Sequence, residues 1–163
     1  MYYAIVATFM FVFPLLSIGI EVAVVGLAPV VYLVGKWFVF WSVGIRLFTA
    51  GLRQIFQPEY TAQTILGMKS TESLLLVREL GFANVALGTA GILSLFFPTW
   101  RLPVALIGGI FYGLAGVNHV LQDHRNQLEN VAMVSDLFVA AVLLAVVGVI
   151  GYQAWALRGG HTG

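Results

Sequence analysis

Long stretches without an acidic or basic residue dominate the chain. Four such runs, each of 20 or 21 residues, extend over 1–20, 80–100, 102–122 and 137–157. A fifth apolar segment, about 29–56, is interrupted only by three basic residues. Since a membrane-spanning helix needs about 20 mostly apolar residues, the pattern predicts an all-α integral membrane bundle of five transmembrane helices. Four helices remain the alternative, if the first segment and the start of the second do not both span.

Turn-forming residues divide these segments. Gly26 and Pro29 mark a turn within the first 50 residues, which are too long for one crossing. Residues 98–101 form a short reversal, whereas 57–77 and 123–130 are the two polar connections. We therefore expect a single transmembrane domain over 1–158 and a disordered tail at 159–163. The predicted helices cover about 3–24, 30–56, 77–97, 102–122 and 132–156.

The amino-terminal run is interpreted as a retained helix rather than a signal peptide. It lacks a basic leading region, and no cleavage site of small residues precedes a polar start. With the amino terminus inside, four basic residues lie on the inner side and three on the outer side. The positive-inside rule thus favours an inner amino terminus and an outer carboxyl terminus.

Composition agrees with a membrane location. Hydrophobic residues make up 60% of the chain and charged residues 9%, against about 45–50% and about 25% in soluble domains. This excludes a soluble enzyme domain, a disordered chain and a nucleic-acid-binding protein. The chain has no cysteine, which excludes disulfides, thiolate nucleophiles and cysteine-ligated metals.

Charged residues inside apolar helices need a reason, because each costs about 2.5–3.5 kcal/mol on insertion scales. Arg46 lies deep in the second helix and shares a helical stripe with Ala50, Arg53 and Gln57. The stripe is either a cationic lining for an anionic or carbonyl-bearing ligand, or a structural partner for an acid on a neighbouring helix. Glu21 either marks a helix end, pairs with Lys36 across the tight turn, or carries a proton.

Spaced glycines occur on the third and fourth predicted helices. Gly81, Gly88 and Gly91 share one face with Asn84, and the fourth helix carries glycines at 109, 113 and 116. Small residues allow helices to approach closely, and asparagine can form a hydrogen bond across the contact. We expect the two glycine stripes to pack against each other.

His119 and Asp123 lie four residues apart, a spacing that can converge on a metal or a proton path. A metal site needs three or four ligands, and His124 lies on another face. A hydrogen-bonded structural histidine is the preferred interpretation. The sequence has no nucleophile elbow, HExxH motif, P-loop or Rossmann glycine set, so it predicts neither a catalytic residue nor a metal or cofactor of its own.

The inward-facing polar residues are expected to form one internal cluster. Its predicted members are Arg46, Arg53, Arg78, Glu79, Asn84, His119, Gln122 and Asp136. Asp136 is placed in the first turn of the fifth helix, where an acid suits the helix dipole. We expect opposite charges in the cluster to pair, for example Arg46 or Arg78 with Glu79 or Asp136, because an unpaired charge in this setting is costly.

Three segments carry a family resemblance. They are the run Lys36-Trp37-Phe38-Val39-Phe40-Trp41-Ser42-Val43-Gly44-Ile45-Arg46-Leu47-Phe48-Thr49-Ala50-Gly51-Leu52-Arg53-Gln54, the run Arg78-Glu79-Leu80-Gly81-Phe82-Ala83-Asn84, and Asn118-His119 through Gln122. Together, over about 36–140, they resemble a bacterial family of multi-pass membrane proteins of unknown function, distantly similar to the DoxX-like group. The resemblance implies the bacterial inner membrane and an accessory role near quinone-linked redox complexes, or quinone or lipid binding.

Three functions are compatible with the sequence. The first is a structural or accessory subunit of a membrane complex, either a homo-oligomer or bound to another membrane protein. The second is a binding protein or carrier for a quinone, lipid or similar amphiphile. The bound quinone or lipid would then be its cofactor. The third is a small enzyme or proton-coupled transporter that uses Glu79 and His119.

Overall fold

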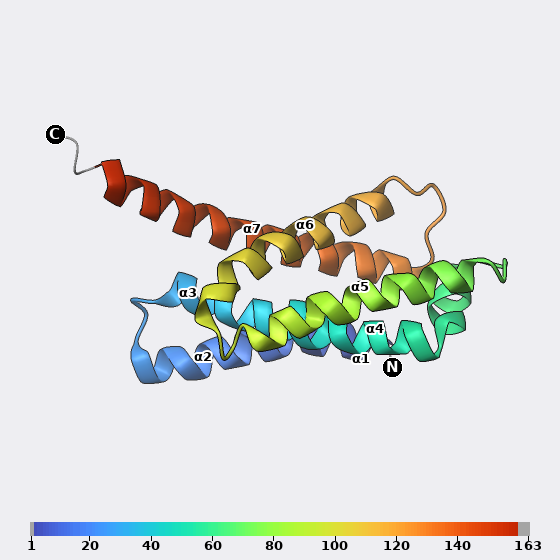
Figure 1. The fold of residues 1–163 in the computed structure, drawn as a ribbon, viewed down its shortest axis with the longest axis horizontal. Helices are drawn as coiled ribbons and strands as arrows, with labels where there is room; N and C mark the ends of the chain where they lie inside the picture. The colour runs from blue at the N-terminus through green and yellow to red at the C-terminus, as the bar shows by residue number, and fades with distance from the viewer. Residues whose placement is uncertain (1, 160–163) are drawn as a thin grey trace.

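The structure is a computed structural model that describes residues 2–159, all of whose regular elements are helical (Figure 1). In chain order the elements are α1 (Tyr2–Ala7), η1 (Thr8–Val12), α2 (Phe13–Val25), α3 (Val30–Phe38), η2 (Val39–Ile45), α4 (Arg46–Phe56), η3 (Tyr60–Ile65), α5 (Ser73–Leu93), η4 (Pro98–Trp100), α6 (Arg101–Val120) and α7 (Gln127–Gly159). Here η1, η2 and η3 are π-helical and η4 is a 3₁₀ turn.

Five helical segments are long and apolar enough to cross a membrane, which confirms the predicted all-α bundle. They are Tyr2–Val25, Val30–Phe56, Ser73–Leu93, Pro98–Val120 and Gln127–Arg158. The first two are continuous rods in which a π-helical segment, η1 or η2, lies between α-helical ones. Of the predicted disordered tail, Gly159 ends α7, and 160–163 lie outside the described residues.

The first two rods form a hairpin held by polar contacts. Gly26 adopts a φ of +81°, a conformation that glycine tolerates best, and ends α2. Lys36 Nζ donates to both carboxylate oxygens of Glu21 at 2.7 Å, and Trp37 Nε1 donates to the same carboxylate at 2.7 Å. Of the alternatives for Glu21, the structure therefore has the ion pair with Lys36.

Glycines bring α4 and η2 into backbone contact with α5. A Cβ at Gly88 would lie 2.4 Å from the backbone nitrogen of Phe48, and one at Gly91 would lie 2.5 Å from that of Gly44. The glycines at 109, 113 and 116 of α6 pack instead against α7, where a Cβ at Gly116 would lie 2.7 Å from the side chain of Leu137. The expectation that the two stripes pack on each other is thus wrong, because a small-residue face indicates a close contact without specifying the partner helix.

Two helices begin earlier than the sequence predicts. At α5, the hydroxyl of Ser73 donates to the Ser70 carbonyl at 2.6 Å, and the helix starts at Ser73 rather than 77. At α7, Asn126 and Glu129 form a reciprocal capping box with bonds of 3.0 Å and 2.8 Å. The box starts α7 at Gln127, so Asp136 lies in the third helical turn and not in the first, as predicted.

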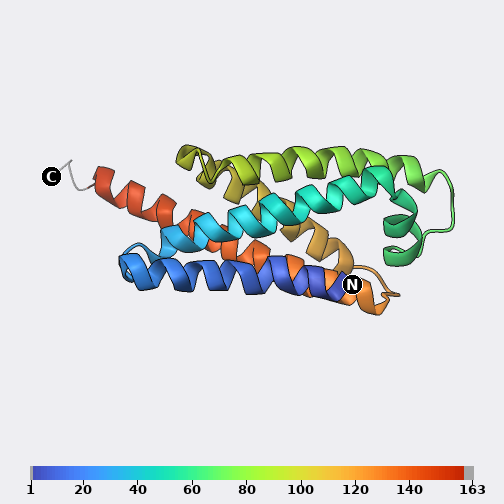
Figure 2. The same ribbon diagram turned by 90° about the horizontal axis from the view of Figure 1, so that it is seen from below.

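The connections fall at two opposite ends of the bundle. The start of α1, the 57–72 connection and the 121–126 connection lie at one end, and the 26–29 turn, η4 and the end of α7 lie at the other (Figures 1 and 2). Helices α5 and α6 meet near η4 and diverge toward the first end in both views. The orientation of this bundle in the membrane stays a prediction.

We predict that Gly88→Ala lowers the free energy of unfolding by about 1–3 kcal/mol, the usual penalty for overpacking a tight contact. The added methyl group meets the Phe48 backbone, so α4 and α5 must separate. The check is thermal unfolding of the purified protein in detergent micelles. Gly148→Ala is the matched control, since a Cβ there meets no atom within 4 Å. Equal stability of the two variants would contradict the packing described.

Candidate ligand-binding cavity

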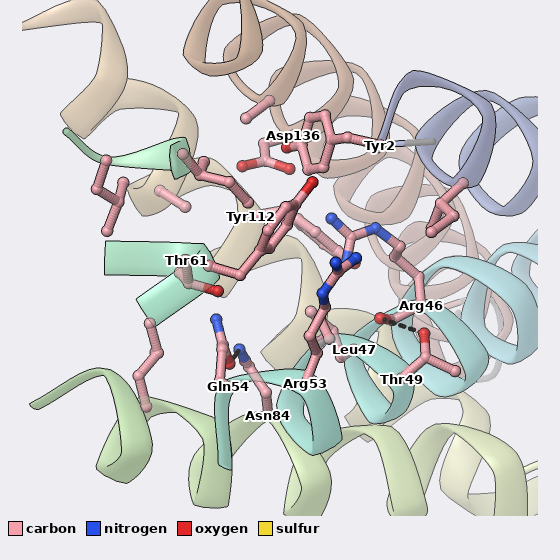
Figure 3. A pocket seen from close by; sticks show the side chains of 18 of the residues that line it. Tyr2, Arg46, Leu47, Thr49, Arg53, Gln54, Thr61, Asn84, Tyr112 and Asp136 are labelled. Atoms are coloured by element: carbon pink, nitrogen blue, oxygen red, sulfur yellow. Dashed lines mark hydrogen bonds between the residues drawn. The ribbon is translucent and has the colours of Figure 1, made fainter. Parts of the chain in front are cut away.

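A cavity of about 230 Å³ lies between the helices, next to Tyr2 at the start of α1 (Figure 3). All five membrane-spanning segments and the 57–72 connection contribute to its wall. Its polar or charged lining residues are Tyr2, Arg46, Thr49, Arg53, Gln54, Tyr60, Thr61, Asn84, Tyr112, His119 and Asp136. The remainder of the wall is apolar, so the cavity combines a polar region with a hydrophobic surface.

The packing of α4 on α5 determines which residues of α4 line the cavity. Gly51 faces α5, where a Cβ would lie 2.6 Å from the Gly81 carbonyl oxygen. Arg53 follows two residues later, which is about 200° around an α-helix. The side chains of Arg53 and Arg46 therefore leave the α5 contact and point into the cavity, as Figure 3 shows. This agrees with the helical stripe that the sequence predicts.

Aromatic rings lie against both guanidinium groups. The Arg53 guanidinium carbon is 3.5 Å from the centroid of the Tyr60 ring, and that of Arg46 is 6.0 Å from the Tyr2 ring. Such cation–π contacts contribute about 0.5–2 kcal/mol. They orient the guanidinium planes while leaving N–H groups available for other partners.

Four buried polar atoms on the cavity wall lack a hydrogen-bond partner among the described residues. They are Nε of Arg46, Nε of Arg53, Oδ1 of Asn84 and Nδ1 of His119. Asn84 is only 4% exposed and His119 only 9%. Leaving a buried donor or acceptor unsatisfied costs about 1–3 kcal/mol, and native proteins rarely do so without a reason. All four atoms belong to side chains that line the cavity.

The expected ion pairs of the cluster are not formed. Asp136 lines the same cavity as Arg46, yet within residues 2–159 the one ion pair is that of Lys36 with Glu21. Arg46 and Arg53 are therefore held near Asp136 without a direct bridge to it. The pairing prediction is wrong because the helices that carry these groups are kept apart by the cavity between them.

Other lining residues were missed by the sequence analysis. Gln54 accepts a hydrogen bond of 2.8 Å from Asn84 Nδ2, which fixes that amide at the cavity wall. The Tyr112 hydroxyl donates to the backbone carbonyl of Ser42 in the π-helical segment η2. A polar glutamine next to Arg53 in a membrane-spanning segment is the sequence signal that could have identified Gln54. The sequence holds no signal for Tyr112, because a buried tyrosine in an apolar helix is common.

The 57–72 connection closes one side of the cavity. Its π-helical segment η3 presents Tyr60 and Thr61 to the cavity, with Ile65 beside them. Asn126, in the other connection at this end, donates its side-chain amide to the Ile65 carbonyl at 2.8 Å. The 57–72 connection therefore folds back onto the bundle. The sequence did not predict this, because the connection has no periodic pattern of hydrophobic residues.

The cavity brings together five of the eight residues predicted to cluster, namely Arg46, Arg53, Asn84, His119 and Asp136. Arg78 and Glu79 are exposed on α5 and do not line it. Their expected inward orientation is wrong, because the buried glycine face of α5 turns Glu79 nearly to the opposite side. Gln122 lies beyond the end of α6, outside the cavity wall, where its carbonyl accepts from Arg125 Nη1 at 2.6 Å.

The His119 and Asp123 pair does not converge. His119 is buried at the cavity, whereas Asp123 is exposed in the following connection. Among the residues that the structure describes, no three histidine, aspartate or glutamate side chains form a metal-binding group. The arrangement offers two cations, one acid and several hydrogen-bonding groups beside an apolar wall, which is a set suited to binding.

These features define an integral membrane protein with five apolar helices and, between them, a cavity that carries both polar and apolar groups. Over residues 1–158 the chain matches the model of a family of unknown function, DUF6790, and it belongs to that family. No curated protein and no solved structure matches it.

We predict that Tyr60→Leu loosens η3, because it removes the ring that stacks on Arg53. Loss of a contact worth about 0.5–2 kcal/mol should speed amide hydrogen exchange of residues 60–65 between about twofold and about thirtyfold. Tyr60→Phe keeps the ring and should exchange like the wild type. Unchanged exchange in the leucine variant would show that the stacking does not hold the segment.

Proposed function

We propose that this protein is a membrane binding protein or carrier for a small amphiphile, which occupies the cavity between its helices. The observation that carries the proposal is the set of four buried, unpartnered polar atoms on one cavity wall. A bound head group would supply the missing hydrogen bonds. Hydrogen bonds from these atoms to the head group would then contribute to the free energy of ligand binding, because they are not made when the protein folds without the ligand.

The position of the cavity favours an amphiphile over a water-soluble ligand. Polar side chains reach the cavity from every membrane-spanning segment and from η3, whereas Leu80 of α5 and Phe111 and Ala115 of α6 contribute apolar surface. Leu80 is 38% exposed, so the wall reaches the outer surface of the bundle at α5. This is where α5 diverges from α6 (Figure 2). An acyl or isoprenoid chain could leave the cavity there, toward the lipid.

The other two functions have less support from the geometry. An accessory subunit with a purely structural cluster calls for paired charges, and Arg46 and Asp136 form no bridge. That role, with its oligomer or membrane-protein partner, stays a prediction, to be tested by co-purification. A transporter or enzyme using Glu79 and His119 would need both at one site, but Glu79 is exposed outside the cavity. The bacterial inner membrane and the DoxX-like similarity also stay predictions.

We predict that Ala115→Trp abolishes retention of a co-purifying amphiphile, because the indole fills the cavity. The measurement is native mass spectrometry of protein extracted in a mild detergent, followed by identification of the released small molecules. Ala145→Trp adds the same side chain to an exposed position of α7 and should retain the ligand. Equal retention by the two variants, or no bound amphiphile in the wild type, would refute the proposed function.

A further inference from the structure

We propose that the head group bound in this cavity is an oxyanion, such as a carboxylate or a phosphate ester, held by Arg46 and Arg53. This inference rests on the proposed function and specifies the chemical class of its ligand. It excludes a neutral quinone as the preferred occupant.

The charges of the wall give the first argument. The lining holds two arginines and one acid, Asp136, so its formal net charge is +1 with histidine neutral. A net charge inside a membrane bundle is costly unless it is paired. An anionic head group offsets this positive charge, whereas a neutral head group leaves it uncompensated.

The half-buried basic residues give the second argument, whereas Lys69, Arg78 and Arg158 are exposed. Lys36 is bound by the Glu21 carboxylate, and Arg101 donates to the Ser94 carbonyl at 3.1 Å. Arg125 donates to three carbonyls at the end of α6. Each of these cations has a dedicated partner, yet Nε of Arg46 and Nε of Arg53 have none among the described residues. These two are therefore the cations for which the ligand must provide the partner.

The geometry of the two arginines gives the third argument. They lie seven residues apart on one helix face, and both side chains point into the cavity (Figure 3). A guanidinium is planar and donates in a fork, a geometry that matches the oxygens of a carboxylate or phosphate. The Tyr60 ring supports the plane of the Arg53 guanidinium. The unpartnered Nδ1 of His119 can donate to a further oxygen of the head group in the tautomer that carries its proton there, whereas the unpartnered Oδ1 of Asn84 only accepts.

The test uses the full-length protein in a neutral detergent and a panel of probes with the same C16 chain. The probes are palmitate, hexadecyl phosphate, hexadecanol and hexadecylamine, together with decylubiquinone and inorganic phosphate. Binding is measured by ligand-induced change in melting temperature and by native mass spectrometry. We expect at least one of the two anionic amphiphiles to bind about tenfold more tightly than the neutral probes, which is typical of a charged hydrogen bond.

Variants connect this preference to the two arginines. Arg46→Gln and Arg53→Gln should each weaken binding of the anion about tenfold or more, with little effect on hexadecanol. Arg78→Gln removes an exposed arginine outside the cavity and should leave the preference unchanged. If a glutamine variant fails to fold, the wild-type order of affinities still decides the question.

The outcomes separate this inference from the proposed function. Binding of decylubiquinone or hexadecanol as tightly as the anions, with loss in Ala115→Trp, would overturn the anionic head group and keep the amphiphile site. Binding of no amphiphile at all would overturn both. A preference for palmitate identifies a carboxylate and one for hexadecyl phosphate a phosphate, and either supports the inference. Binding of inorganic phosphate as tight as that of hexadecyl phosphate would contradict a membrane amphiphile.

Discussion

Backbone contact between α4 and α5 is the constraint on which the rest of the structure depends. Glycines on both helices allow it, and Gly51 and Gly88 each lie where a methyl group would meet the backbone of the other helix. This contact uses one face of α4. Because an α-helix turns 100° per residue, it directs Arg46 and Arg53 to the other side, where α1, α6 and α7 surround a cavity instead of lipid.

Directing Arg46 and Arg53 into a membrane-spanning bundle has a large cost in free energy. In water an unpaired arginine is common, but within a bilayer a charged or unsatisfied group needs a partner. Lys36, Arg101 and Arg125 obtain theirs from a carboxylate or from carbonyls. Arg46 and Arg53 face a cavity and share it with Asp136, to which neither is bridged. The fold thus places two arginines in a cavity of the membrane-spanning bundle without an ion pair to the acid that shares it.

Much of this site follows from the sequence because helical spacing is local information. The seven-residue separation of Arg46 and Arg53 was enough to place them on one face. The inward orientation predicted for Glu79 is wrong because the sequence does not show which face of α5 is buried. The face that carries Gly88 packs against α4, and Glu79 lies nearly opposite to it. The partner of each glycine stripe and the return of 60–65 onto the cavity depend on tertiary contacts. The pattern of hydrophobic and polar residues indicates neither feature, so both are seen only in the structure.

The most direct test of this account is an experimental density map of the protein in native lipid. The account predicts an elongated non-protein density whose compact end contacts the guanidinium groups of Arg46 and Arg53 and whose tail leaves between α5 and α6. It would be contradicted by a map in which Arg46 and Asp136 form a direct ion pair and only water fills the cavity. In that case the polar cluster would hold the bundle together and not a ligand.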